Sequence, residues 1–312
     1  MSRLFSRWLS LLLASLLLTG PALAAPASAP PVPLLWKVTG HQGATLYLLG
    51  SFHLLRPDDY PLASEVDAAF ARATRVMFEL PADQVQSPEL AAQMLQAAAR
   101  SDGGSLREDL TPAQWTALQA YAAQHGLSLQ TLSGYDAWFV ALTLSLSEMA
   151  VDGLDPSLGL DQHFMREAGE AGKASAGLET AAEQISLLDG MSREEQRQML
   201  AEALDDIRDG NRQSRELHDA WRRGDAAKMW SEMALDMKRE YPALYRNINV
   251  ARNDRWVPKL EARLQAGQGT TLVVVGTLHL LGADGVVEKL RARGYQVERI
   301  CAACAKPEAG NR

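Results

Sequence analysis

The chain has 312 residues, of which 31 are lysine or arginine and 38 are aspartate or glutamate, giving a formal net charge of −7 at pH 7. Because nucleic acids and anionic membranes attract basic surfaces, an acidic chain without a basic run is a poor candidate to bind either of them. The length suffices for one large hydrophobic core or two smaller ones.

The first 24 residues have the three parts of a secretory signal peptide. Arg3 and Arg7 are basic, residues 9–18 are apolar, and Ala22-Leu23-Ala24 is a small-residue cleavage site. We expect cleavage after Ala24, a periplasmic or secreted protein, and no stable membrane insertion afterwards. An uncleaved membrane anchor is the alternative, and the shortness of the apolar stretch disfavours it. A linker rich in proline and alanine, residues 25–33, is expected before the folded domain.

Helices are expected to predominate in the middle of the chain. A hairpin with its turn at His41-Gln42-Gly43 comes first. The periodicity then predicts helices over residues 88–99, 112–125, 135–149 and 161–171, a short strand over 174–179, and a mostly helical region over 192–264 with breaks at Gly210 and Gly224.

One sequence pattern occurs twice. Residues 45–55 read TLYLLGSFHLL, and residues 271–281 read TLVVVGTLHLL. Each copy is an aliphatic run, typical of a buried strand, that ends in Gly-x-x-His. Each copy is followed by a predicted helix and strand, at 64–73 and 75–80 in the first case and at 283–293 and 295–300 in the second. We therefore predict two β-α-β units whose strand ends bring two histidines to one site.

These elements predict an α/β fold in which the central sheet is built from duplicated β-α-β units at the two chain ends. A single domain is expected over residues 34–304, with a large helical insertion at about 87–264 and a tail at 305–312. Cys301 and Cys304 lie close to this tail, and a local disulfide is the preferred interpretation. Glu298 is interpreted as a structural residue of an edge strand.

Four polar residues are predicted at carboxyl ends of strands, where ligand sites of open α/β sheets lie. They are His53, Glu79, Glu179 and His279. Two histidines with one or two carboxylates suit zinc, manganese, iron or cobalt. Such a set predicts metal-activated water that attacks a carbonyl, with a spare carboxylate as general base.

Each of these residues also has a structural interpretation. The histidines could be core imidazoles bonded to backbone, and Glu79 could face solvent or pair with an arginine. Glu179 could simply begin a helix. Gly50 and Gly276 precede the histidines and would let the backbone approach an ion or substrate.

The run RNINVARNDRW, residues 246–256, is a further candidate. On a helix, Asn249, Arg252, Asn253 and Trp256 share one face, which could hold a carboxylate or an oxyanion. A solvated, ion-paired face is the alternative. The remaining histidines are expected at the surface or in a turn: His41, His125, His163 and His218.

Taken together, the motifs resemble the TraB/GumN family, which is similar to the Tiki proteases and, more distantly, to erythromycin-esterase-like and ChaN-like folds. The resemblance rests on LLWKVTG, both Gly-x-x-His motifs, VMFEL, LDPSLGLDQHF, AGLETAAEQ and ARNDRW, in this order. It implies His53, His279 and Glu79 as functional residues. Arg252 and Asn253 are implied as helpers, and Asp161 as a weaker one.

The resemblance implies a divalent metal, manganese or cobalt before zinc, because Tiki-like relatives are regarded as metal-dependent peptidases. Gly50, Gly276, Asp161 and Glu179 are then expected to contact a peptide or small-molecule substrate. Other relatives are discussed as proteins that bind or inactivate pheromones. The expectation is an exported metal-dependent hydrolase, and the alternatives are a non-catalytic periplasmic binding protein for a peptide or signal molecule and a helical partner-binding module.

Overall fold

The computed structural model describes residues 29–101 and 103–305. The predicted signal peptide, the start of the linker and nearly all of the tail lie outside these residues. Within them, no helix is both long and apolar enough to cross a membrane. The predicted disulfide between Cys301 and Cys304 is confirmed.

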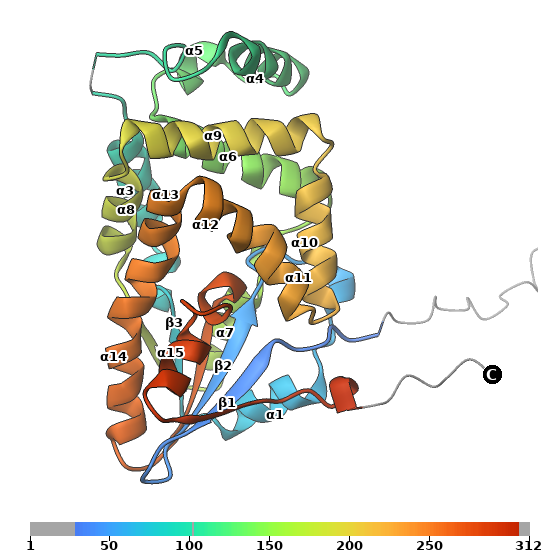
Figure 1. The fold of residues 1–312 in the computed structure, drawn as a ribbon, viewed down its shortest axis with the longest axis vertical. Helices are drawn as coiled ribbons and strands as arrows, with labels where there is room; N and C mark the ends of the chain where they lie inside the picture. Colours follow the sequence, from blue (N-terminus) through green and yellow to red (C-terminus); the bar gives the residue numbers. More distant parts are fainter. Residues whose placement is uncertain (1–28, 102, 306–312) are drawn as a thin grey trace, which may run out of the picture.

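The sheet has six strands in the order β4-β3-β5-β2-β1-β6. It forms the lower part of the molecule as drawn in Figure 1. Its strands are β1 (Leu35–Thr39), β2 (Thr45–Ser51), β3 (Arg75–Phe78), β4 (Ala174–Gly177), β5 (Thr270–Gly276) and β6 (Gln296–Arg299). β1 and β2 form the predicted hairpin, with Gly43 at a φ of +93° in its turn. β1 is antiparallel to both neighbours, and all other neighbouring strands are parallel. The carboxyl ends of β2, β3, β4 and β5 therefore meet at one edge.

The two copies of the repeated pattern form neighbouring parallel strands. β2 and β5 pair along their whole length, with Ser51 beside Gly276. The helix and strand predicted after each copy are present, as α1 (Ser64–Arg72) with β3 and α15 (Val286–Ala292) with β6. β3 lies inside the sheet next to β5, whereas β6 lies at its edge. A mixed α/β fold is confirmed, and duplication of the unit stays a prediction.

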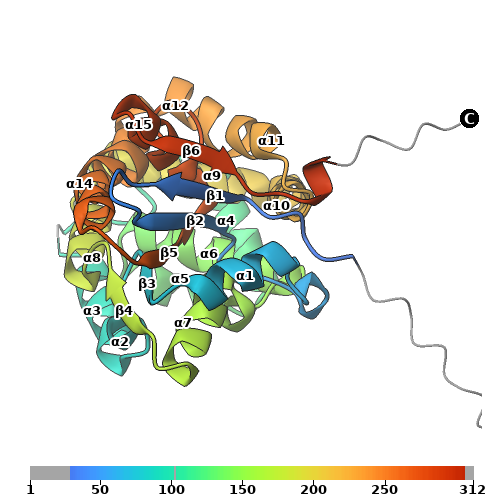
Figure 2. The ribbon, with the colours of Figure 1, turned by 90° about the horizontal axis from the view of Figure 1, so that it is seen from below.

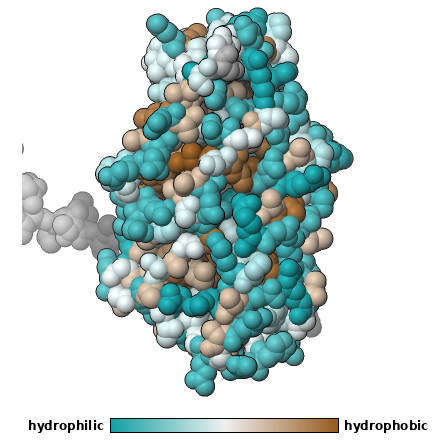
Figure 3. All heavy atoms as spheres, turned by 90° about the vertical axis from the view of Figure 1, so that its left-hand side faces the viewer, coloured by the Kyte–Doolittle hydropathy of each residue, from teal (hydrophilic) through white to brown (hydrophobic). Residues whose placement is uncertain are grey.

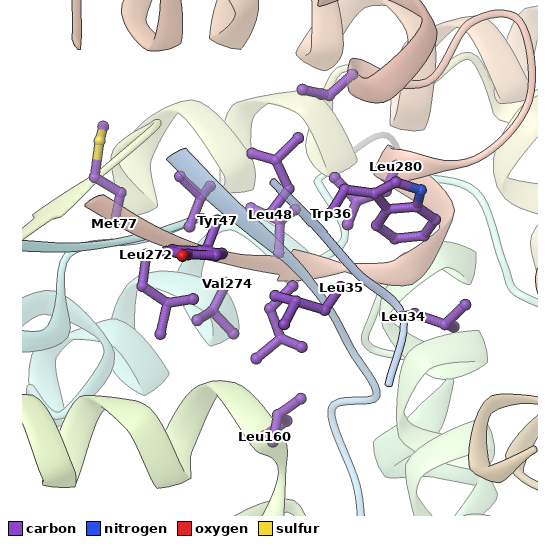
Figure 4. Packing of buried hydrophobic residues seen from close by; sticks show 14 of the residues in the cluster. Leu34, Leu35, Trp36, Tyr47, Leu48, Met77, Leu160, Leu272, Val274 and Leu280 are labelled. Carbon is purple, nitrogen blue, oxygen red and sulfur yellow. The ribbon is translucent and has the colours of Figure 1, made fainter. Parts of the chain in front are cut away.

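Helices cover both faces of the sheet (Figure 2). α1 and α7 (Leu160–Glu170) lie on one face, and α14 (Ala251–Gln265) and α15 lie on the other. This arrangement explains why the parallel strands β2 and β5 are apolar along their length instead of alternating. Figure 4 shows the resulting core, in which Leu35, Leu48 and Val274 are fully buried.

Most other helices lie beyond the carboxyl ends of the strands (Figure 1). They are α2 (Ala82–Val85), α3 (Pro88–Ala98), α4 (Pro112–Gln124), α5 (Leu129–Leu132), α6 (Ala137–Val151), α8 (Ala181–Asp189), α9 (Arg193–Arg208), α10 (Arg212–Arg222), α11 (Ala226–Trp230), α12 (Asp236–Glu240) and α13 (Pro242–Tyr245). Two π-helices, Ser231–Leu235 and Arg246–Val250, interrupt the last part of this region. The predicted breaks at Gly210 and Gly224 follow α9 and α10, with φ values of +69° and +63°.

This helical region has a core of its own. Leu118 of α4, Val140 and Leu144 of α6, and Leu200 of α9 are buried together in it. The same stretch of chain also provides β4, which is a strand of the sheet, and α7 and α14, which pack against the faces of the sheet. The helical region is therefore attached to the strand ends on several sides.

Candidate active site at the strand ends

The predicted strand-end residues converge at one point. His53 follows β2, Glu79 follows β3, and His279 lies in the 3-10 turn Thr277–Leu280 after β5. Glu79 Oε1 lies 3.8 Å from His53 Nε2 and 4.0 Å from His279 Nε2. The repeated pattern therefore brings its two imidazoles together, as predicted.

Gly276 leaves the space in which these groups meet. A Cβ at this position would lie 3.0 Å from His53 Nε2 and 3.1 Å from Glu79 Oε1. The Gly276 backbone N–H also donates to Glu79 Oε1 over 2.7 Å. A Cβ on Gly50 would instead lie 2.9 Å from Thr277 Oγ1. Gly276 thus lines the cluster, and the structure does not bring Gly50 to it.

Arg252 of α14 links the carboxylates to His279. Its Nη2 donates to Glu79 over 2.5 Å and to Glu179 over 2.5 Å, and its Nε donates to Glu179 over 3.0 Å. Its Nη1 donates to His279 Nε2 over 2.9 Å and to the Ile248 carbonyl over 3.3 Å. The five N–H groups of this guanidinium therefore all have acceptors. Glu179 is thus part of the cluster through Arg252.

The face predicted on the run 246–256 is buried. Asn249, Asn253 and Trp256 are 0% exposed and Arg252 is 8% exposed. Trp256 Nε1 donates to Glu179 over 3.2 Å, and its ring lies 4.4 Å from that of His279. The alternative interpretation of this face as solvated is wrong.

Asn253 fixes the tautomer of His279. Asn253 Nδ2 donates to the backbone carbonyl of Asp284 over 2.8 Å, so its Oδ1 faces His279 Nδ1 at 2.8 Å. Because an amide oxygen only accepts hydrogen bonds, Nδ1 of His279 carries the proton. Burial, together with the positive charge of Arg252, lowers the pKa of His279 to about 3. His279 is therefore neutral, with the lone pair of Nε2 directed to the site.

His53 has a different partner and a different charge. Its Nδ1 donates to Asp161 Oδ1 over 3.0 Å, and the Ser51 hydroxyl donates to the same oxygen over 3.0 Å. Partial desolvation opposes a charge on His53, but Asp161 and Glu79 outweigh it and raise its pKa to about 9. The side chain of His53 is 51% exposed and that of His279 is 7% exposed. Solvent therefore reaches the cluster beside His53.

Glu79 is ionised despite its burial. Burial alone would raise the pKa of this carboxyl, but Arg252, the charged His53 and the Gly276 N–H hold it well below its usual range. Glu79 therefore forms the salt bridge with an arginine that was the alternative interpretation, and it also lies close to both imidazoles.

The donor atoms are of the types that bind divalent ions, but their present arrangement is not that of a metal site. Ligand atoms of a tetrahedral zinc site lie about 3.4 Å apart, and the two distances from Glu79 Oε1 are 3.8 and 4.0 Å. The Nη1 of Arg252, however, donates to the same nitrogen of His279 that would bind the ion. In the part of the chain that the structure describes, no three His, Cys, Asp or Glu side chains are already arranged as a metal site.

Two sizeable hollows lie along α8, away from this cluster. A cavity of about 550 Å³ between α8 and α14 is lined by Ala182, Ser186 and Arg255, and one of about 680 Å³ lies between α8 and α3. Neither is lined by the residues that converge at Gly276. Figure 3 shows this side of the molecule, where a small apolar area is surrounded by polar surface.

One prediction about the other histidines is wrong. His218 was expected at the surface, but it is 2% exposed and bonded through Nε2 to the carboxylate of Asp59 over 2.8 Å. Asp59 lies more than 150 positions earlier in the chain, so the polar sequence around His218 does not reveal this partner. His125 is exposed, His163 is half-buried, and His41 is exposed in its turn.

Replacing Arg252 by methionine should strongly destabilise the protein, because two buried carboxylates would lose their shared cation. We expect Arg252→Met to lower the free energy of unfolding by about 3–5 kcal/mol in urea denaturation. Arg208→Met is the matched control, because Arg208 is 67% exposed and pairs with Asp205 at the surface; its expected loss is below about 1 kcal/mol. Equal losses would contradict the role of Arg252 as the centre of the cluster.

The two motif glycines should differ when each is changed to alanine. Gly276→Ala places a methyl group between His53 and Glu79, so the pKa of His53, measured by NMR, should fall while the melting temperature changes little. Gly50→Ala should leave that pKa unchanged and lower stability by about 1–3 kcal/mol through overpacking against Thr277. The opposite pattern would show that Gly50, not Gly276, lines the site.

Searches of curated proteins and of solved structures found no match to this chain. The model of the TraB/PrgY/gumN family matches residues 34–299, which include the whole cluster from His53 to His279. The resemblance inferred from the motifs is thereby confirmed, and the chain belongs to the TraB/PrgY/gumN family.

Proposed function

We propose that the protein is a divalent-metal-dependent hydrolase with a peptide-like substrate. The observation that carries the proposal is the convergence of His53 Nε2 and His279 Nε2 on Glu79 Oε1, around the space left by Gly276. The N-terminal sequence supports export of the protein. Manganese or cobalt is the proposed metal, with zinc as the next choice.

The charges at the site support a divalent cation. The carboxylates of Glu79, Asp161 and Glu179 are in hydrogen-bond contact with two cations, Arg252 and the imidazolium of His53. Replacing the proton of His53 by a divalent ion would balance the three negative charges together with Arg252. The net charge of these five groups is therefore −1, and one additional positive charge would neutralise it.

Two local changes would accompany binding. His53 would lose the proton on Nε2, and Arg252 would give up its hydrogen bond to His279 Nε2. Arg252 would keep its bonds to Glu79 and Glu179. His279 needs no proton exchange, because its Nδ1–H already donates to Asn253.

A bound divalent ion supplies a Lewis acid and lowers the pKa of a water molecule. The chain itself holds Glu79 ionised through Arg252, so this carboxylate stays available as a negatively charged ligand beside the two imidazoles. Asp161 orients His53, and Asn253 orients His279. Solvent and substrate approach beside the half-exposed His53, since Arg252, Glu179 and Trp256 close the other side.

A non-catalytic binding protein is the second candidate, and one observation favours it. Arg252 already satisfies His279 Nε2, so the cluster is complete without a metal. In that case ligand affinity would survive Glu79→Gln, and no substrate would be turned over with added manganese, cobalt or zinc. Turnover that Glu79→Gln abolishes would exclude the binding protein.

Metal content tests the proposal directly. After anaerobic reconstitution with manganese or cobalt, purified wild-type protein should retain near-stoichiometric metal in elemental analysis. His53→Ala and His279→Ala should each lose most of it, because each removes one ligand. His125→Ala is the control, since His125 is exposed and lies outside the cluster. Negligible metal in all four proteins would sink the proposal.

Metal affinity should depend on pH through His53. Its pKa of about 9 means that the ion must displace a proton at neutral pH, so affinity should rise about tenfold per pH unit up to about pH 9. Asp161→Asn removes a charge that raises this pKa, so the rise should end at a lower pH. Calorimetric titrations across pH measure both effects, with Asp205→Asn on α9 as the control. A pH-independent affinity would contradict His53 as a ligand.

A further inference from the structure

Two amide side chains lie behind His279, one above the other along the helix. Asn249 belongs to the π-helix Arg246–Val250, and Asn253 follows one turn later on α14. Both are 0% exposed. Asn253 contacts His279 directly, whereas Asn249 reaches it only through Asn253.

Each hydrogen-bonding group of the Asn253 amide has a partner. One N–H of Nδ2 donates to the Asp284 carbonyl over 2.8 Å, and the other donates to Asn249 Oδ1 over 3.2 Å. The Oδ1 of Asn253 accepts from His279 Nδ1 over 2.8 Å. Because a flipped Asn253 would direct its oxygen at two acceptors, the pair of acceptors fixes its orientation.

Asn249 accepts a hydrogen bond in this arrangement, but its own amide N–H groups gain nothing comparable. Its Oδ1 is used by Asn253, whereas its Nδ2 lies near the Tyr245 hydroxyl without a hydrogen bond of ordinary geometry. A buried amide with an unused donor is unfavourable for stability. An apolar side chain of similar size would avoid that penalty, so packing alone does not explain an asparagine here.

The π-helix contributes to the same cluster. A π-turn shifts backbone carbonyls away from the regular α-helical pattern, and such turns are frequent at functional sites. Here the carbonyl of Ile248 accepts from Arg252 Nη1 over 3.3 Å. One short π-helix therefore supplies an acceptor for Arg252 and an acceptor for Asn253.

We propose that Asn249 is a positioning residue that, through Asn253, holds His279 in the Nδ1-protonated tautomer and keeps Nε2 free to accept. Without the Asn249 oxygen, only the Asp284 carbonyl orients Asn253 and only Arg252 opposes a proton on Nε2, so the Nε2-protonated tautomer of His279 becomes more accessible. In that tautomer Nε2 can neither accept from Arg252 nor bind a metal ion. The consequence for metal binding rests on the proposed function, whereas the tautomer does not.

The tautomer of His279 can be measured in metal-free protein by long-range ¹H–¹⁵N NMR of histidine. Wild-type protein should show a protonated Nδ1 and an unprotonated Nε2. Asn249→Leu and the smaller Asn249→Ala should shift His279 to a mixture of tautomers. Asn249→Asp retains an acceptor oxygen and should restore the wild-type pattern. Asn247→Leu is the matched control, because Asn247 lies in the same π-helix but donates to Glu195.

Melting temperatures, measured alongside, show which variants fold. An unchanged tautomer in a folded Asn249→Ala or Asn249→Leu protein would overturn the proposal, whatever its stability. If the protein binds metal, the same variants should weaken affinity by about 10–100-fold. If it binds none, the proposed function fails while the tautomer experiment still decides the role of Asn249.

Discussion

The guanidinium of Arg252 is the interaction on which the site depends. It lies at 8% exposure between groups that follow three different strands: Glu79 after β3, Glu179 after β4 and His279 after β5. A buried arginine is tolerated only when its charge is balanced and its donors are used, and here all five N–H groups have acceptors. A lysine could not replace it, because a single ammonium cannot reach these acceptors in one plane. Arg252 thus sets the spacing of the strand ends in addition to balancing their charge.

This constraint explains why α14 lies where it does. Trp256 packs one turn after Arg252, donates to Glu179 and contacts the ring of His279, so the helix is attached to the sheet by polar and apolar contacts at the same place. Asn253 projects from the turn between them. The helical region beyond the strand ends, although it has its own core, therefore meets the sheet through residues of the site.

Much of this arrangement was predictable from the sequence, because it depends on local patterns. The repeated aliphatic run predicted two strands with a histidine after each, and the lone carboxylate in VMFEL identified Glu79. The rest depends on long-range contacts. The sequence repeat aligns Gly50 with Gly276, but the sheet pairs Ser51 with Gly276, so equivalent glycines have different surroundings. The partners of Arg252 and His218 are distant in sequence, and no local pattern reveals them.

The repeated motif places the two histidines, but their hydrogen-bond partners decide their chemistry. Both imidazoles donate through Nδ1, yet His53 donates to the carboxylate of Asp161 and His279 donates to the amide of Asn253. The carboxylate favours an imidazolium at the exposed His53, whereas the amide adds no charge to the buried His279 beside Arg252. Two copies of one sequence pattern therefore give one positively charged and one neutral ring. Under the proposed function, a cation would require the charged ring to release a proton and Arg252 to release Nε2 of the neutral ring, so the two copies of the motif would respond to the ion in different ways.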